Sequence, residues 1–281
     1  MATHIYQIFY NETTRAQVDP GFMPLENTGN PRPDWREYWP IRNFFLQNVL
    51  EEDDLYGFFS PNFFGKTQLQ SQRVHRFIEE NPGNEVYTFT PFLQDSTCYL
   101  SMFEQGNRYH PGMIPLVQAF LASIELDVDL SRLAMDFRST IYCNFLVAKP
   151  SFWGKWFAIT ERLYEDVENG NSDFARRMNE LTTYHKMPLD MKVFVMERIA
   201  SLILALDHSI PVAHFDMGLM PWSDPMYYPC RDDMFVLNAL KMAYIASGDE
   251  RYLKLFYPLR NQVLKRCDRQ YGDEKRETFF N

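Results

Sequence analysis

The sequence predicts an α/β protein with a mainly parallel sheet, and two observations lead to this prediction. In the first ninety residues, β-branched and aromatic runs alternate with amphipathic stretches, in the order strand, helix, strand, helix, strand. The chain of 281 residues is 46% hydrophobic and 23% charged, which is typical of a folded protein with a large core. Ligands bind such sheets beyond the carboxyl ends of the strands, so the residues that follow each strand are candidates for a site.

Each element of the first ninety residues has its own signal. β-branched and aromatic residues predict strands at 4–10, 55–60 and 85–90, each followed by a polar or proline-containing break. The Pro- and Gly-rich residues 19–33 predict a loop. Residues 35–48 predict a helix with Asp34 as its N-cap, although Pro40 must kink or restart it. Residues 71–81 predict an amphipathic helix that Pro82 and Gly83 terminate.

The remainder of the chain is mostly helical by the same criteria. Apolar periodicity predicts helices at 112–126, 150–168, 192–206, 232–247 and 250–266. A strand is expected at 139–148, and residues 268–281 form a charged tail. No linker separates two domains, so we expect residues 1–206 to be the core and residues 207–281 to be a mainly helical extension of the same domain.

Charge, cysteine and glycine content exclude several classes of protein. The 28 Lys and Arg residues against 37 Asp and Glu give a net charge of −9, which argues against a nucleic-acid partner. The four cysteines have no CxxC spacing, so neither a zinc site nor a disulfide framework is indicated, and a reduced, cytoplasmic compartment is expected. Glycine-rich nucleotide-binding motifs, GxSxG and HExxH are absent, so the corresponding dinucleotide, P-loop, esterase and zinc-protease interpretations lose their support.

Acidic residues at two places are candidates for chemistry. Asp127 and Asp129 have the spacing of two carboxylates that share a hard cation such as Mn²⁺ or Mg²⁺, but the alternative is a solvated run of acids at a helix end. Glu197 lies in an otherwise apolar stretch, where a carboxylate is costly unless it is paired or exposed. It is either paired with Arg198 or Lys192 or exposed on the polar face of the helix, or it is a buried acid with a raised pKa that serves as a general base or holds a sugar hydroxyl.

Basic and aromatic residues offer further candidates. Arg108 and His110 lie in a polar loop before a predicted helix, where they would contact phosphate or, alternatively, only cap the helix. Aromatic residues make up 16% of the chain, which fits a large core or a site for a sugar-like ligand.

Four short segments, in this order, resemble GT-A-like glycosyltransferases of bacterial capsule and lipopolysaccharide clusters, especially the group with the DUF4422 domain. Glu-Asn-Thr-Gly-Asn at 26–30 is similar to that group's Asp-Asn-Thr-Gly-Asp loop, and Glu-Tyr-Trp-Pro-Ile-Arg-Asn at 37–43 to its Tyr-Trp-x-x-Lys-Asn helix. Tyr-Cys-Asn-Phe-Leu-Val-Ala at 142–148 is similar to its Cys-Asn-Met-Phe-Ile strand. Val-Met-Glu-Arg-Ile at 195–199 is similar to its (Ser/Ala)-Glu-Arg-Leu helix.

The resemblance implies a GT-A-like, Rossmann-type sheet with helices on both faces and a helical C-terminal region. It also implies a hexosyltransferase-like enzyme that takes a UDP- or GDP-sugar and extends a glycan or lipid-linked acceptor at the inner face of the inner membrane. The nucleotide sugar would lie near the following residues: Gln7, Tyr10, Asn11, Glu12, Asn27, Tyr38 and Arg42.

The resemblance also assigns residues near the sugar or acceptor. Asn144 and Glu197 would lie there, with Glu197 as the first candidate base and Asp136 as the second. A basic pair that the family carries after the second strand is missing, and only Lys66 remains close to compensate the diphosphate. The sequence leaves inverting and retaining mechanisms open. The alternative function is a non-catalytic carbohydrate-binding or glycan-assembly protein.

Overall fold

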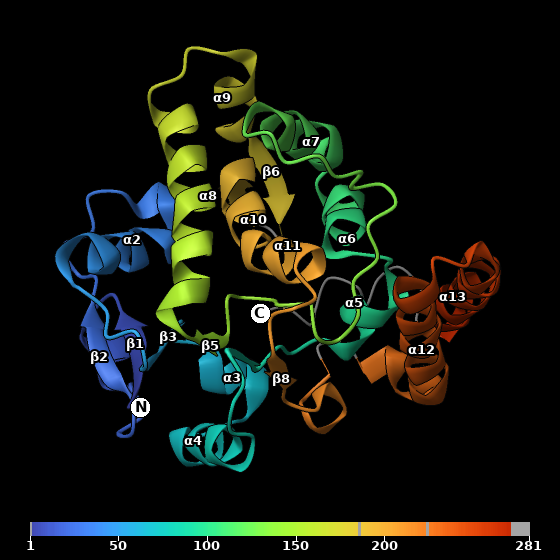
Figure 1. Ribbon diagram of the computed structural model, residues 1–281, viewed down its shortest axis with the longest axis horizontal. Coiled ribbons are helices and arrows are strands. Elements are labelled where there is room, and N and C mark those ends of the chain that lie inside the picture. Colours follow the sequence, from blue (N-terminus) through green and yellow to red (C-terminus); the bar gives the residue numbers. More distant parts are fainter. Residues whose placement is uncertain (1, 185–186, 223–224, 271–281) are drawn as a thin grey trace.

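Six strands form one sheet at the centre of the protein. The computed structural model describes residues 2–184, 187–222 and 225–270 (Figure 1). The strands of the sheet occur in the order β2-β1-β3-β5-β4-β8, and β5 runs antiparallel to both of its neighbours while the other pairs are parallel. The predicted α/β class with a mainly parallel sheet is therefore confirmed. The strands of the sheet are β1 (Thr3–Phe9), β2 (Met23–Glu26), β3 (Leu55–Phe59), β4 (Val86–Thr88), β5 (Leu146–Ala148) and β8 (Val212–His214).

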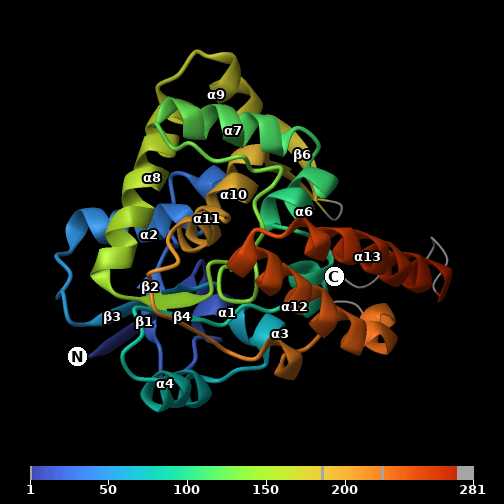
Figure 2. The ribbon, with the colours of Figure 1, turned by 45° about the vertical axis from the view of Figure 1, so that its right-hand side comes forward.

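Helices cover both faces of this sheet, because alternate side chains of each strand point to opposite sides. In β1, Ile8 packs in a core with Trp153 and Trp156 of α8 (Pro150–Glu168), whereas Ile5 packs with Val74 of α4 (Ser71–Glu80). Figure 2 shows α4 below the sheet, with α2 (Tyr38–Gln47) and α8 above it. The aromatic excess is thus largely core, as the twelve largest fully buried side chains are all aromatic.

The segment after residue 206 also contributes to the sheet. Val212–His214 forms β8 and pairs with β4, which adds an edge strand that sequence analysis missed. The helices α12 (Arg231–Ser247) and α13 (Glu250–Gln270) then pack together and against α5 (Leu93–Cys98), at the end of the molecule away from α2 (Figure 1). None of the described helices is both long and apolar enough to cross a membrane.

The strands β6 and β7 pair in a separate two-stranded sheet. Their bounds, with those of the remaining helices and 3₁₀ turns, are α1 (Glu12–Arg15), η1 (Pro33–Trp35), α3 (Phe63–Thr67), α6 (Met102–Tyr109), α7 (Met113–Ser123), α9 (Asp173–Met178), β6 (Leu181–Tyr184), β7 (Met187–Asp190), α10 (Met191–Met196), α11 (Ile199–Leu206), η2 (Met217–Leu219) and η3 (Pro225–Cys230).

Several predicted boundaries were wrong, for local physical reasons. The helix expected at 35–48 begins only at Tyr38, with Glu37 rather than Asp34 at its N-cap, and Pro40 fits into its first turn. The strand expected at 139–148 is reduced to β5, and the helix expected at 192–206 is two helices that break at Glu197 and Arg198. The loop expected at 19–33 contains β2.

Candidate active site

A pocket opens at the carboxyl end of β3, where an α/β sheet is expected to bind its ligand. The pocket has a volume of about 40 Å³, enough to enclose one functional group rather than a whole nucleotide sugar. Its walls come from η1 and the start of α2, the residue after β3, α3, the segment before β5, and the end of α10. The lining residues are Trp35, Arg36, Glu37, Tyr38, Ser60, Lys66, Cys143, Asn144, Val193, Met196 and Glu197.

Predicted site residues from distant parts of the chain meet in this pocket. Tyr10 does not line the pocket itself, but its hydroxyl donates a hydrogen bond of 3.0 Å to Oε1 of Glu37, which does. Residues expected near the nucleotide are therefore next to residues expected near the sugar. The predicted residues that line the pocket themselves are Tyr38, Lys66, Asn144 and Glu197.

Glu197 has the environment of a carboxyl group that can accept a proton. It is half-buried where the chain leaves α10, and Val193 and Met196 of the same helix line the pocket beside it. Burial raises the pKa of Glu197, while the charges of Lys66 and Arg198 act in the opposite direction. A carboxyl group with a raised pKa in a pocket is suited to general acid–base chemistry near neutral pH.

Arg198 and Lys192 were considered as ion-pair partners of Glu197, but both make hydrogen bonds to other residues. The guanidinium of Arg198 donates to the main-chain oxygens of Met102 and Phe194 and to Gln105. The ammonium of Lys192 binds Asp34 and Asn179 instead. The electrostatic influence of Arg198 on Glu197 remains, but these contacts leave the carboxyl group able to face the pocket.

Cys143 and Asn144 form a strained segment at the pocket. Their φ angles are +61° and +52°, left-handed values that are uncommon for non-glycine residues and that cluster at functional sites. Two such residues in succession interrupt an extended strand, which explains why β5 begins only at Leu146. The side chain of Asn144 is 6% exposed, and its Oδ1 finds no donor among the described residues. A ligand hydroxyl would satisfy this buried acceptor, whose burial is otherwise costly.

Arg42 lies outside the pocket, although its position in the sequence suggested a contact with diphosphate. Its guanidinium makes a bidentate ion pair with Glu161 of α8, at 2.6 and 2.9 Å. It also lies 4.3 Å from the ring centroid of Tyr164. Tyr38 donates to the same Glu161 carboxylate at 2.6 Å. These contacts attach α2 to α8 and give Arg42 a structural function.

Gln7 and Asn27 are buried near the ends of their strands. Gln7 faces away from Tyr10, accepts a hydrogen bond from the main-chain nitrogen of Asp19, and donates to the oxygen of Pro61. Asn27 is 8% exposed, its main chain bonds to Phe9, and its Nδ2 has no acceptor among the described residues. Neither of them lines the pocket.

Asn11 and Glu12 lie at the solvent-exposed start of α1. The side chain of Asn11 caps that helix by accepting from the nitrogen of Thr14, and Thr14 completes a capping box. Glu12 is 3.7 Å from Arg15 in an exposed ion pair. The structure therefore gives both residues a local explanation and places neither in the pocket.

The polar loop expected around Arg108 and His110 is largely helical. Arg108 is exposed in the last turn of α6, where a basic residue is favourable for the helix dipole. His110 is buried, its ring stacks on Phe194 at 3.8 Å, and its Nδ1 shares a hydrogen bond of 2.8 Å with Thr182. His110 thus packs against α10 through Phe194.

None of the three candidate aspartates lines the pocket. Asp127 is exposed, and Asp129 accepts hydrogen bonds from Ser131 in a local turn. Asp136 is buried and accepts two hydrogen bonds from the guanidinium of Arg138, at 2.9 and 2.6 Å. Within residues 2–184, 187–222 and 225–270 no three acidic, His or Cys side chains are placed to hold a metal ion.

Sequence reasoning missed several polar residues of the pocket, among them Arg36, Glu37 and Cys143. Glu37 and Cys143 stand inside segments that were used for the family resemblance, but neither was expected to act. The sequence signal that could have identified Glu37 and Cys143 is that they directly precede the predicted site residues Tyr38 and Asn144. Comparisons of the chain with protein-family models, with curated proteins and with solved structures gave no match.

Proposed function

We propose that the protein is a glycosyltransferase of GT-A-like fold that moves a sugar from a UDP- or GDP-sugar to a growing bacterial surface glycan. The observation that carries the proposal is the convergence of Glu197, Asn144 and Lys66 in one pocket at the carboxyl end of β3. The resemblance of the four sequence segments supports it independently. The enzyme would work in the cytoplasm, at the inner face of the inner membrane.

We propose an inverting displacement in this pocket, in which Glu197 is the base. The carboxylate of Glu197 takes the proton of the acceptor hydroxyl, whose oxygen forms a bond to the anomeric carbon of the donor sugar. The bond from that carbon to the diphosphate oxygen breaks, and the nucleoside diphosphate leaves with the electron pair. Asn144 accepts a hydrogen bond from a sugar hydroxyl, and Lys66 lies close enough to Glu197 to influence its ionisation. No metal ion enters this scheme.

The test combines calorimetry with a pair of variants. The native protein should bind a UDP- or GDP-sugar, and Glu197→Gln should retain binding but lose about 100-fold or more in transfer rate. Glu79→Gln is the control, because Glu79 is exposed on α4 outside the pocket. Unchanged transfer in Glu197→Gln would remove Glu197 from the mechanism. The absence of nucleotide-sugar binding would overturn the proposed function.

A non-catalytic carbohydrate-binding protein is the second candidate, and one observation favours it. Arg42, Asn11 and Glu12, which were expected at the nucleotide, are all outside the pocket. A carbohydrate-binding protein would keep the pocket and would not need these residues. Calorimetry distinguishes the two functions, since this protein would bind free sugars and show no heat with UDP or GDP.

A further inference from the structure

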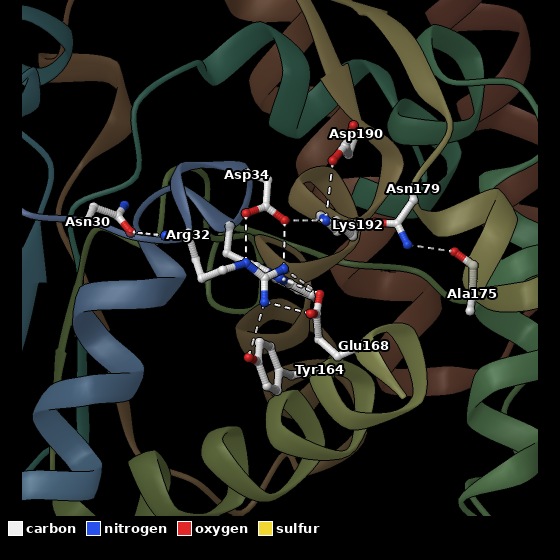
Figure 3. Close-up of polar contacts among 10 residues, drawn as sticks. Asn30, Arg32, Asp34, Tyr164, Glu168, Ala175, Asn179, Asp190 and Lys192 are labelled. Carbon is white, nitrogen blue, oxygen red and sulfur yellow. Dashed lines mark hydrogen bonds and ion pairs between the residues drawn. The ribbon is translucent and has the colours of Figure 1, made fainter. Parts of the chain in front are cut away.

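A buried ammonium group joins four segments of the chain behind the pocket. Lys192 is 2% exposed, and its Nζ lies 2.6 Å from Asp34 Oδ2, 2.6 Å from Asn179 Oδ1 and 3.3 Å from Asp190 Oδ2 (Figure 3). The same Nζ is 4.8 Å from the ring centroid of Trp35. Lys192 thus connects η1, the residue after α9, the end of β7 and the start of α10.

A second cation extends these contacts to α8. Arg32 donates to Asp34 and makes two hydrogen bonds of 2.5 Å to Glu168 (Figure 3). Glu168 also accepts from the indole nitrogen of Trp35 at 2.9 Å. Burial alone would raise the pKa of Asp34, but hydrogen bonds from Arg32 and Lys192 outweigh it and lower the pKa to about 2. The carboxyl group of Asp34 is therefore ionised throughout the physiological range of pH.

The network joins two of the segments that line the pocket. Trp35 lies in one wall and against Lys192, while Val193, the next residue after Lys192, lies in the other wall. Removing an ammonium group from water is costly, and apolar side chains hold helices together at least as well. Ionic contacts at this position differ from apolar packing in one respect, because they fix direction and distance between the segments that they join.

We propose that Lys192 is a positioning residue, whose contacts with Asp34 and Trp35 set the separation of the pocket walls formed by residues 35–38 and 193–197. The proposal rests on the proposed function only for the identity of the ligand. The geometry of the pocket can be measured without any ligand, because Cys143 lines it and is partly exposed, whereas Cys98 and Cys230 are buried. Alkylation of Cys143 therefore reports on the packing of the walls.

The experiment compares Lys192→Met with a matched control. Lys241 is equally buried, at 1% exposure, but donates to the main-chain oxygens of Ser96 and Tyr99, away from the pocket. Each full-length variant is treated with iodoacetamide, and mass spectrometry follows the peptide that contains Cys143. We expect alkylation about tenfold faster in Lys192→Met than in the native protein, and unchanged in Lys241→Met. An unchanged or slower rate in Lys192→Met overturns the proposal.

A second variant keeps the proposal testable if Lys192→Met does not fold. Asp34→Asn keeps the shape of the side chain and removes the charge that Lys192 contacts, so it should accelerate alkylation of Cys143 in the same direction by a smaller factor. Equal acceleration in Lys241→Met would indicate general loosening and would also overturn the proposal. If the native protein binds no nucleotide sugar while the alkylation results hold, the proposed function fails and the positioning function of Lys192 stands.

Discussion

The ammonium nitrogen of Lys66 lies 3.1 Å from the sulfur of Cys143, so α3 and the left-handed segment before β5 meet at the pocket. Glu37 and Glu197 contribute two carboxyl groups to the same pocket, and Arg36 and Lys66 contribute two cationic groups, so neither sign of charge predominates in its lining. A ligand hydroxyl would find acceptors there, and a ligand anion would find two cations.

The contact of Lys66 with Cys143 predicts the pH dependence of that thiol. Burial raises the pKa of Cys143 to about 11, and the ammonium of Lys66 acts against this rise because it stabilises the thiolate. Lys66→Met should therefore raise the pKa further and slow alkylation of Cys143 at every pH below it. The measurement is the alkylation rate between about pH 7 and pH 11. Lys254→Met, on the exposed surface of α13, is the control, and a faster reaction in Lys66→Met would contradict the prediction.

Because Arg42 pairs with Glu161, we expect a substitution of Arg42 to lower the stability of the protein without changing its affinity for a ligand. Arg42→Lys keeps the charge but loses the bidentate geometry, so the free energy of unfolding should fall by about 1 kcal/mol. Because Arg42 is outside the pocket, the affinity for a nucleotide sugar should remain unchanged. Urea denaturation and calorimetry on the same preparation check both expectations. A loss of affinity without a loss of stability would show that Arg42 contacts the ligand.

The strong periodic signals in the sequence predicted the class of fold well. The helix expected at 150–168 has the same bounds in the structure, because Pro150 can only occupy the first turn and the apolar spacing is regular. Elements that depend on tertiary contact were missed. The three-residue strand β8 forms because it pairs with the edge of β4. The intrinsic β-propensity of three residues is too weak to predict such a strand.

Tyr38, Asn144 and Glu197 were expected at the site from the family resemblance, and all three line the pocket. Glu197 was also expected from its isolation among apolar residues, and its position at the end of α10 brings it to the pocket. The partner of Arg42 could not be expected, since Glu161 is far away in the sequence and competes with any ligand for the guanidinium. Short sequence motifs identify residue types, but they do not show which buried partner a charged group will find.

The contrast between two glycines tests the packing of the sheet that supports the site. A Cβ atom on Gly57 in β3 would lie 2.7 Å from Cγ2 of Val147 and 3.1 Å from the oxygen of Leu146 in the adjacent strand β5. Because β3 and β5 are hydrogen-bonded at this point, Gly57→Ala should lower the free energy of unfolding by about 1–3 kcal/mol.

Gly154→Ala is the matched substitution, at an exposed position in the second turn of α8, where a Cβ atom meets nothing within 4 Å. Alanine restricts the unfolded chain and favours the helix, so the free energy of unfolding should rise by up to about 1 kcal/mol. The midpoints of urea denaturation for the two variants should therefore move in opposite directions from that of the native protein. A Gly57→Ala midpoint at or above the native value would show that β5 is not held against β3 as closely as Val147 and Leu146 indicate.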